Sequence, residues 1–450
     1  MKVDDRVVGY CAVGDLQGYP RHTLEKIRSE GLNAIKDKGF RIVEFPGFLN
    51  KLNDADSVVR LFRKESVELV VLNFASWGEG GSILRLCNGL ESLPFILWAF
   101  GNHNENLTLT GIMEATSNMV KTLRRFSIVL GPPSSQNAAS ELIRSISTIC
   151  VVGDLREVKI GLIGCNSPGM VDATADEISL RRKIGSEVVH LDLTEVFHVC
   201  NEIPEENVAE HAKMLKARIG RVETGEEDLL ASVRLYFALK EIVRKHNLQG
   251  FSIRCWPELK GNQSRCFMTP CYAIAALADE GYVAACEADL SSTVTMLIMK
   301  MLTGKAAASF DYNTFDVSKN TLTLWHCGAN ALSLAVDEHE VILGRPTNGG
   351  LFETDSGMSV EFSLREGRAT LAKLTREYDK MLIVCGKVIK PSPEFRGGIA
   401  EVCLDAPVES FLMNMMEQGF EHHICLVHGD IRNELIKICE RLSIEPVVFE

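Results

Sequence analysis

The sequence predicts an α/β protein with two doubly wound parallel-sheet domains followed by a β-rich C-terminal domain. Two observations support this class. Up to about residue 345, short apolar strands alternate with helical segments, which is typical of parallel sheets covered on both faces. After about Gly344, strand patterns follow one another through short polar turns. The length of 450 residues also exceeds what one hydrophobic core normally serves.

The first predicted domain, residues 1–155, has the strand–helix alternation of a flavodoxin-like sheet. Each strand is a short run of apolar residues, and each helix has apolar residues at helical spacing. In order, the predicted elements are strand Val7–Val13, helix His22–Lys38, strand Arg41–Phe45, helix Ala55–Lys64, strand Glu68–Phe74, strand Pro94–Phe100, helix Ile112–Arg125, strand Ser127–Leu130 and helix Ala138–Thr148.

The second predicted domain, residues 156–345, repeats this alternation. Its predicted strands are Lys159–Gly164, Glu187–Leu193, Phe251–Cys255, Tyr282–Ala288, Ala306–Tyr312 and Leu322–Cys327. Its predicted helices are Glu205–Ile219, Glu226–His246, Tyr272–Glu280 and Ser292–Leu302.

The third predicted domain, residues 346–450, begins with three strands expected to pair consecutively and antiparallel, Met358–Leu364, Arg368–Leu374 and Met381–Val388. A helix at Val408–Gln418, a strand at His423–His428, a helix at Ile431–Leu442 and a last strand complete it.

Composition and charge exclude several classes of function. Hydrophobic residues make up 46% of the chain and the formal net charge is −12, so a nucleic-acid partner is not expected. The densest basic cluster, 181–183, is predicted to be a solvated helix face. No signal-peptide pattern or membrane-length apolar run is present, which predicts a soluble cytoplasmic protein. The 14 cysteines form no Cys-x-x-Cys pair and are interpreted as reduced core thiols.

The glycine-rich stretches do not predict a nucleotide site. Gly78–Ser82 follows a strand but lacks the spacing of a dinucleotide-binding loop, and the chain has no P-loop pattern. A Gly-x-Ser-x-Gly nucleophile elbow is absent as well.

Polar residues at predicted strand ends are the candidate site residues, because ligands bind at the carboxyl ends of parallel strands. Glu287 ends an apolar strand, so its carboxylate must be paired, bound to metal or solvated. Asp289 is better explained as a helix N-cap, and Asp311 fits a turn equally well. His326 also ends a strand, where a structural role is common.

The adjacent histidines His422 and His423 precede and begin a predicted strand. Because side chains alternate along a strand, only one of the two is expected to face a given site.

Several motifs together resemble the L-fucose isomerase family and its relative, L-arabinose isomerase. They are Gly281–Asp289, Leu302–Gly304, Ser309–Asp311, Leu324–Gly328, and Gly419–His423 with Ile444–Glu445. The resemblance is best over 259–330 and the last thirty or so residues, and the N-terminal third matches in layout only.

That resemblance implies a divalent metal, usually Mn²⁺, with Mg²⁺ or Co²⁺ as alternatives, held by Glu287, Asp311 and His423. His422 stays open as the histidine ligand. The arabinose branch would add His326 as a ligand, but the short Asp311 resembles the fucose branch.

The implied reaction interconverts an aldose and a ketose, such as L-fucose, L-arabinose or D-arabinose, through an enediol. Glu287 and Asp311 would act as metal ligands and also as acid and base. Which of the two carboxylates transfers a proton first is left open. Trp77, Trp256, His326 and His422 are predicted to bind substrate, although packing explains each tryptophan equally well. A homo-oligomer, hexameric or trimeric, is also implied.

Three alternatives remain at this point. The first is an isomerase of the same fold that acts on a sulfonated sugar, the second a metal-dependent lyase or epimerase, and the third a sugar-binding protein without catalysis.

Overall fold

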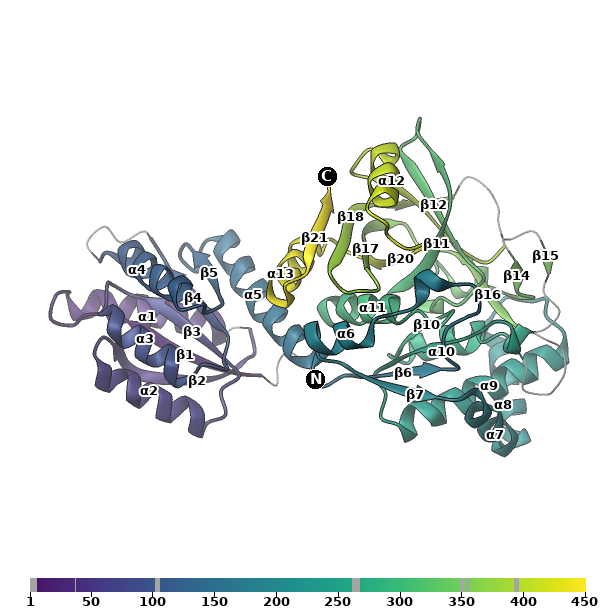
Figure 1. Ribbon diagram of the computed structural model, residues 1–450, viewed down its shortest axis with the longest axis horizontal. Helices are drawn as coiled ribbons and strands as arrows, with labels where there is room; N and C mark the ends of the chain where they lie inside the picture. The colour runs from purple at the N-terminus through teal and green to yellow at the C-terminus, as the bar shows by residue number, and fades with distance from the viewer. Residues whose placement is uncertain are drawn as a thin grey trace. The chain divides into compact units, whose positions relative to one another are not determined.

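The computed structural model of the chain describes residues 6–36, 38–101, 106–260, 268–348, 352–353, 357–391 and 396–450 (Figure 1). The chain divides into two compact units, Met1–Asp154 and Leu155–Glu450. None of the helices in the described ranges combines the length and apolar character that crossing a membrane requires.

The first unit contains one parallel sheet of five strands in the order β2-β1-β3-β4-β5. This is the flavodoxin-like order. Three of its strands are completely buried, as expected for continuous apolar runs covered on both faces. The strands are β1 (Val7–Val13), β2 (Arg41–Leu49), β3 (Leu69–Phe74), β4 (Phe95–Ala99) and β5 (Phe126–Leu130).

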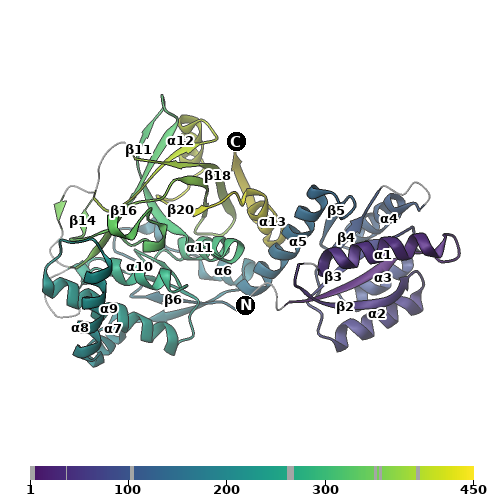
Figure 2. The same ribbon diagram turned by 180° about the vertical axis from the view of Figure 1, so that it is seen from behind.

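Helices cover both faces of this sheet, and each face has its own hydrophobic cluster. Helices α1 (Arg21–Lys36) and α5 (Gln136–Leu155) pack on one face. Helices α2 (Leu52–Lys64), α3 (Gly80–Gly89) and α4 (Thr108–Lys121) pack on the other, and Figures 1 and 2 show the two faces in turn.

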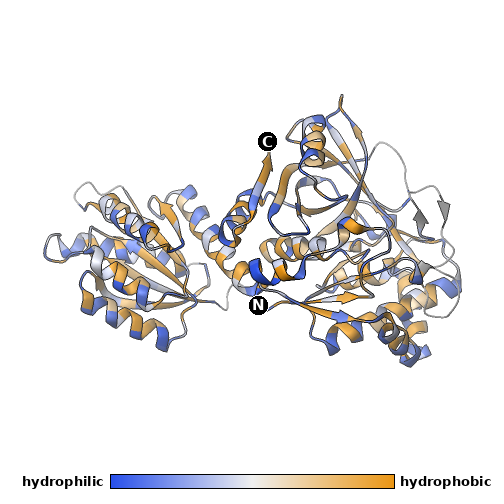
Figure 3. Ribbon diagram, in the orientation of Figure 1, coloured by the Kyte–Doolittle hydropathy of each residue, from blue (hydrophilic) through white to orange (hydrophobic). Residues whose placement is uncertain are grey.

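The second unit begins with a four-stranded parallel sheet in the order β10-β9-β6-β7. Its strands are β6 (Lys159–Ile163), β7 (Glu187–Leu191), β9 (Gly250–Ile253) and β10 (Val283–Ala285). The strands are short and apolar, and Figure 3 shows hydrophobic residues concentrated in them. The associated helices are α6 (Glu177–Lys183), α7 (Leu193–Glu202), α8 (Glu205–Arg218), α9 (Glu226–Lys245) and α10 (Cys271–Asp279).

The rest of the second unit is built around a closed antiparallel barrel. Its strands follow the order β18-β17-β20-β11-β12-β19, and β19 pairs back with β18 to close the ring. Closure leaves these six strands with no unpaired edge inside the ring. They are β11 (Ala308–Asp316), β12 (Thr321–His326), β17 (Gly367–Leu374), β18 (Lys380–Ile389), β19 (Gly398–Leu404) and β20 (His423–His428).

Shorter strands and two helices surround the barrel. From β19, the sheet continues through β16 and β13 to β8, and β21 pairs with β18. These elements are β8 (Arg221–Val222), β13 (Ile342–Gly344), β14 (Thr347–Asn348), β15 (Phe352–Glu353), β16 (Ser359–Ser363), β21 (Glu445–Phe449), α12 (Val408–Glu417) and α13 (Arg432–Leu442).

The predicted fold class is confirmed, since two parallel sheets flanked by helices precede a β-rich region. One strand pairing was predicted wrongly. The segment 358–364 was expected to pair with 368–374, but β16 pairs with β13 and β19. Both edges of β17 are taken by β18 and β20 in the barrel, so β17 has no edge left for β16.

The strands β11 and β12 were predicted within the domain 156–345, yet they pair with β20 and β19 of the barrel. Strand pairing therefore crosses the predicted boundary at residue 345, and the division into three domains stays a prediction.

Helix α11 (Leu290–Thr303) joins the parallel sheet to the barrel. It packs against β9 and β10 of the sheet and against β17 and β20 of the barrel. Its residues from Leu290 to Met299 are all buried, and they are either apolar or small hydroxyl residues, with no charged side chain among them. The N-terminus of α11 therefore lies where the sheet and the barrel meet, and the candidate site forms there.

Candidate active site

Glu287 lies in a tight turn between β10 and α11. Glu287 and Ala288 both have left-handed backbones, with φ of 60° and 63°, which is rare for residues other than glycine. The backbone N–H of Ala288 donates to the carbonyl of Ile253 at 3.1 Å. Such local strain persists only where surrounding contacts impose it, and it is common at functional sites. Here it turns the Glu287 carboxylate toward the barrel, where it meets His423.

His423 is the centre of the site. Its Nδ1 lies 2.8 Å from Oδ2 of Asp289, and its Nε2 lies 3.0 Å from Oε2 of Glu287. The same Nε2 is 3.4 Å from Oδ1 of Asp311. Asp311 stands directly opposite His423 because β11 and β20 pair antiparallel in that register. Barrel pairing thus brings together two residues that are distant in sequence.

His422 repeats this arrangement from the residue before β20. Its Nδ1 lies 2.5 Å from Oδ2 of Asp172, which belongs to the turn 171–173. Its Nε2 is 3.8 Å from Oε2 of Glu287 and 4.0 Å from Oδ1 of Asp311. Each histidine therefore has its own aspartate at Nδ1 and directs Nε2 toward the same two carboxylates.

This geometry leaves electron-rich atoms facing one another. A carboxylate accepts a hydrogen bond from Nδ1–H of each ring, which leaves a lone pair on each Nε2. Those lone pairs face the oxygens of Glu287 and Asp311, so a cation must lie among them, either a proton on a ring or a metal ion. Fixing the ring through Nδ1 is the usual way to orient a histidine that binds a metal through Nε2.

The residues fit a divalent ion. Ligand atoms of Glu287, His422 and His423 all lie within 4.8 Å of one another, and among the described residues this is the group that meets that condition. An octahedral ion with bonds of about 2.1 Å places neighbouring ligands about 3 Å apart. The separations of 3.0 and 3.4 Å around Nε2 of His423 match that value. Oxygen and imidazole donors suit Mn²⁺ or Mg²⁺ better than a soft metal.

Asp289 and Lys373 form a buried ion pair behind His423. Nζ of Lys373 lies 2.5 Å from Oδ2 of Asp289, and the two side chains are 1% and 2% exposed. Asp289 also caps α11 by accepting from the backbone N–H of Ser292 at 2.9 Å. Hydroxyls of Ser291 and Ser292 donate to the same carboxylate at 2.7 Å. The carboxylate is thus fully satisfied and holds His423 rigidly.

The environments of the two facing carboxylates push their pKa values in opposite directions. Burial raises the pKa of Glu287, but the facing rings of His422 and His423 outweigh it and hold the pKa well below its usual range. Burial dominates at Asp311 and raises its pKa despite the nearby histidines. Glu287 therefore stays ionised, whereas Asp311 takes up a proton more readily. Pairs of carboxylates separated in this way commonly divide acid and base roles.

His326 is buried at the end of β12 beside this group. Its Nδ1 accepts a hydrogen bond from the backbone N–H of Cys327 at 2.9 Å. A neutral ring in that state carries its proton on Nε2, so it offers a donor and not a metal-binding lone pair. Its ring stacks near His423, with centroids 6.3 Å apart. The geometry favours a role toward substrate over a role as a ligand.

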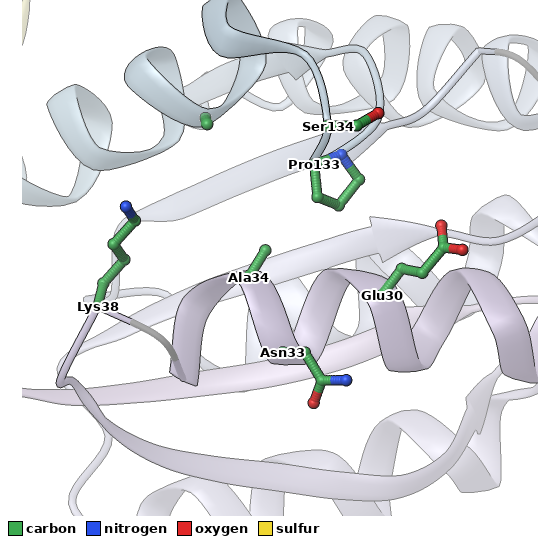
Figure 4. Close-up of a pocket in the computed structure, with 7 residues that line it drawn as sticks. Glu30, Asn33, Ala34, Lys38, Pro133 and Ser134 are labelled. Atoms are coloured by element: carbon green, nitrogen blue, oxygen red, sulfur yellow. The ribbon is translucent and has the colours of Figure 1, made fainter.

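The two predicted substrate tryptophans follow strands of different sheets, Trp77 after β3 and Trp256 after β9. Trp256 follows β9, two residues beyond Arg254, and is 43% exposed. Trp77 belongs to the first unit, where its Nε1 donates to Glu114 at 2.5 Å. Their substrate roles stay predictions. The first unit also has a hollow of about 520 Å³, to which Lys38 and Pro133 contribute, and it contains none of the predicted site residues (Figure 4).

Two sequence interpretations need correction, and a third is confirmed and extended. Asp311 does not open a turn, because β11 continues to Asp316. His422 and His423 both reach the site, because His422 lies outside the strand, where alternation does not apply. Asp289 is the N-cap that was expected, but it also binds His423.

Asp172 and Lys373 were missed altogether. Asp172 lies in an irregular turn without any motif, and Lys373 is one lysine in an apolar strand. The only available signal was Lys373 itself, a charged residue inside a strand where burial was expected.

Comparison with known proteins indicates which reaction this site catalyses. No protein-family model matches the chain. Relatives named sulfoquinovose isomerase from Priestia aryabhattai and Priestia megaterium are each 25% identical over 434 residues, covering 94% of this chain and 95% of theirs. One of the same name from Alkalicoccus urumqiensis is 28% identical over 378 residues, covering 82% and 84%. This chain is a sugar isomerase. The predicted enzyme class, an aldose–ketose isomerase, is thereby confirmed.

Solved structures contribute little. An arabinose-binding protein from Geobacillus stearothermophilus matches with a TM-score of 0.17 and 10% identity over 63% of this chain and 74% of that one. A superposition of that quality carries no argument about this isomerase.

Proposed function

We propose that this isomerase converts sulfoquinovose to its ketose with the help of a divalent metal ion, Mn²⁺ first among the alternatives. The observation that carries the metal site is the convergence of both histidine Nε2 atoms on Glu287 and Asp311. These four residues would hold the ion. The sequence left the histidine ligand open between His422 and His423, and this proposal includes both.

The substrate proposal follows the relatives. Four of them carry the name sulfoquinovose isomerase, and the matches cover 80–94% of this chain. They favour the sulfonated-sugar alternative over L-fucose or L-arabinose. Sulfoquinovose is a six-carbon aldose with a sulfonate on C6, so its C1 and C2 can undergo the same isomerisation as a neutral aldose.

The side chains provide the proton chemistry. Moving a proton between C1 and C2 needs a group that takes it from carbon and a group that manages the hydroxyl protons. Glu287, kept ionised, is the stronger candidate for the first role, and Asp311 for the second. Nε2–H of His326 would donate to a substrate oxygen. A divalent ion held there would polarise the carbonyl and neighbouring hydroxyl as a Lewis acid.

The test starts with the purified full-length enzyme. After chelator treatment and dialysis, sulfoquinovose is supplied with Mn²⁺, Mg²⁺ or Co²⁺, and the products are followed by NMR. We expect formation of the ketose only with added metal, and much slower turnover of L-fucose, L-arabinose and D-glucose. Faster turnover of a neutral sugar would overturn the substrate proposal. Full activity in rigorously metal-free enzyme would overturn the metal proposal.

A second arm distinguishes the enediol route. In D₂O, proton transfer through an enediol places solvent deuterium on the product carbon, whereas a hydride shift keeps the substrate hydrogen. We expect deuterium in the product. The same spectra distinguish isomerisation from epimerisation or cleavage, because each gives a different carbon skeleton or configuration.

We also propose a cytoplasmic homo-oligomer, a hexamer or trimer. This rests on the family resemblance of the motifs, and analytical ultracentrifugation of the purified enzyme tests the assembly.

A further inference from the structure

Arg254 and Glu287 follow neighbouring strands of the parallel sheet. Strands β9 and β10 pair as far as Ser252 opposite Ala285, and both chain segments then leave the sheet at its carboxyl edge. Neighbouring strands lie about 4.8 Å apart. The hydrogen bond from Ala288 N–H to the Ile253 carbonyl keeps the two chain segments together beyond the ends of the strands. An arginine is thus built into the same edge as the proposed reaction centre.

The guanidinium of Arg254 is held in place. Its backbone N–H donates to the carbonyl of Ile163 at 2.9 Å, Nη2 lies 2.8 Å from Oε1 of Glu258, and Nη1 lies 3.5 Å from the carbonyl of Asn166. The side chain is only 21% exposed. Among the described residues, Nε is buried and has no hydrogen-bond partner. This is a positioned cation with an unused donor, unlike a solvated surface arginine.

The loop after β6 connects this arginine to the reaction centre. Asn166 contacts the guanidinium, and the hydroxyl of its neighbour Ser167, itself buried, lies 3.4 Å from the carbonyl of Glu287. Arg254 and Glu287 therefore flank one loop at the carboxyl edge of the sheet. Ligands of open α/β sheets bind at this edge.

A cation near the site would favour a sulfonated substrate. The chain has a net charge of −12, and beside the paired Asp289 and Lys373 the site contains Glu287, Asp311 and Asp172. A sulfonate is always ionised and would be repelled by such a surface. The guanidinium offers planar, directed donors to an oxyanion group.

Arg376 is the competing basic residue near the site. Its Nη1 donates to the carbonyl of Val171 at 3.2 Å, one residue from Asp172, and its Nε bonds to its neighbour Glu377 at 2.5 Å. It is 40% exposed, and screening by water makes it a weaker anchor.

Resting on the proposed function, we propose that Arg254 forms the subsite for the anionic group at C6 of the sugar and thereby sets selectivity for a sulfonated substrate. The reacting carbons lie at Glu287 and Asp311, and the C6 oxyanion lies at the guanidinium. Trp256, exposed on the same segment, flanks this subsite. The ligand class is a sugar with an oxyanion at C6. Sulfonate is favoured over phosphate because it carries a single charge, which the one guanidinium of this proposed subsite can neutralise.

The experiment compares selectivity in the metal-loaded, full-length enzyme. The kcat/KM is measured for sulfoquinovose, for quinovose, which lacks the sulfonate, and for glucose 6-phosphate. In Arg254→Gln we expect the ratio for sulfoquinovose over quinovose to fall about 10- to 100-fold, mostly through KM, as for loss of a hydrogen bond to a charged group. Arg254→Lys should give a ratio between those of wild type and Arg254→Gln, because the charge stays and the fork geometry is lost. Arg376→Gln is the matched control and should keep the wild-type ratio.

Folding is controlled with Arg254→Gln/Glu258→Gln, which avoids leaving the Glu258 carboxylate buried without its partner, and with circular dichroism and Mn²⁺ titration of each variant. An equal loss on sulfoquinovose and quinovose would show a structural role and overturn the proposal. A selective loss in Arg376→Gln would move the subsite there and overturn it as well. Wild-type preference for glucose 6-phosphate would assign the subsite to phosphate, against our proposal. If wild type turns over no sulfoquinovose at all, the proposed function itself fails, which is a separate outcome.

Discussion

Replacing Lys373 with methionine tests whether the buried ion pair behind His423 positions the metal site. Methionine keeps the length and apolar character of the lysine stem but removes the ammonium 2.5 Å from Asp289. Leaving one partner of a buried ion pair alone costs about 3–5 kcal/mol. Asp289 keeps its donors from Ser291, Ser292 and His423, so the cost should be near the lower end, about 3 kcal/mol. For the unit 155–450, with an unfolding entropy of about 2.1 cal/mol/K per residue, that corresponds to a fall in Tm of about 5 °C.

The functional effect should be separable from this loss of stability. An Asp289 carboxylate without its cation is free to draw the His423 proton or to shift, and either change disturbs the ring that directs Nε2 at the metal site. Weakening the partner that orients a metal-bound histidine lowers metal affinity about 10- to 100-fold. Isothermal titration of metal-free Lys373→Met with Mn²⁺ measures that affinity, and thermal unfolding of the same metal-free sample measures stability.

The double variant Asp289→Asn/Lys373→Met supplies the control. Removing both charges leaves no unpaired ion, so most of the lost stability should return, because replacing a buried pair by neutral groups is often close to neutral. Metal affinity should stay low, since an amide holds His423 less firmly than a carboxylate. If Lys373→Met unfolds at the wild-type temperature and binds Mn²⁺ equally well, the argument that this pair positions His423 is refuted.

Further predictions concern the facing groups of the site. Glu287→Gln and Asp311→Asn should each lower kcat at least 100-fold with the fold intact by circular dichroism, and full activity in both would remove them from the mechanism. His423→Ala should weaken Mn²⁺ binding more than His422→Ala, because His423 lies closer to Glu287, at 3.0 against 3.8 Å, and titration calorimetry ranks the two. In metal-free enzyme, the Glu287 carboxylate 3.8 Å away, opposed by burial and aided by Asp172, raises the pKa of His422 to about 9. Its contribution, about 1 kcal/mol after allowance for solvent exposure, should be fully present below pH 6.5 and lost as pH rises through about 9. The Tm difference between wild type and His422→Gln, measured from pH 6 to 10, should therefore shrink with rising pH, and a constant difference would contradict this.

Local patterns predicted those parts of the fold that depend on neighbouring residues. The buried runs of β1, β3 and β4 are mostly apolar, and β20 was predicted with the bounds it has, His423–His428. Asp289 was expected as an N-cap because a predicted helix follows it. These features follow from periodicity and capping within a few residues.

What could not be predicted depends on pairing between distant segments. Barrel closure sets the neighbours of β16 and places Asp311 opposite His423. The residues around each strand predict neither of these pairings. Lys373 bonds to a residue 84 positions away, so no residue near it in β17 indicates its partner. Asp172 lies 250 positions from His422. Such partners become visible only once the strands are in register.

The position of α11 explains why one acidic segment can serve both halves of the site. Its N-cap, Asp289, fixes the helix start and binds His423 of the barrel, while Glu287, two residues earlier, belongs to the turn that leaves the parallel sheet. A shift of the barrel against the sheet would break the hydrogen bonds of His423 with both residues at once. Because α11 is buried between the two layers, such a shift costs core packing as well. The spacing between the proton-transferring carboxylates is therefore fixed by the same contacts that hold the unit together.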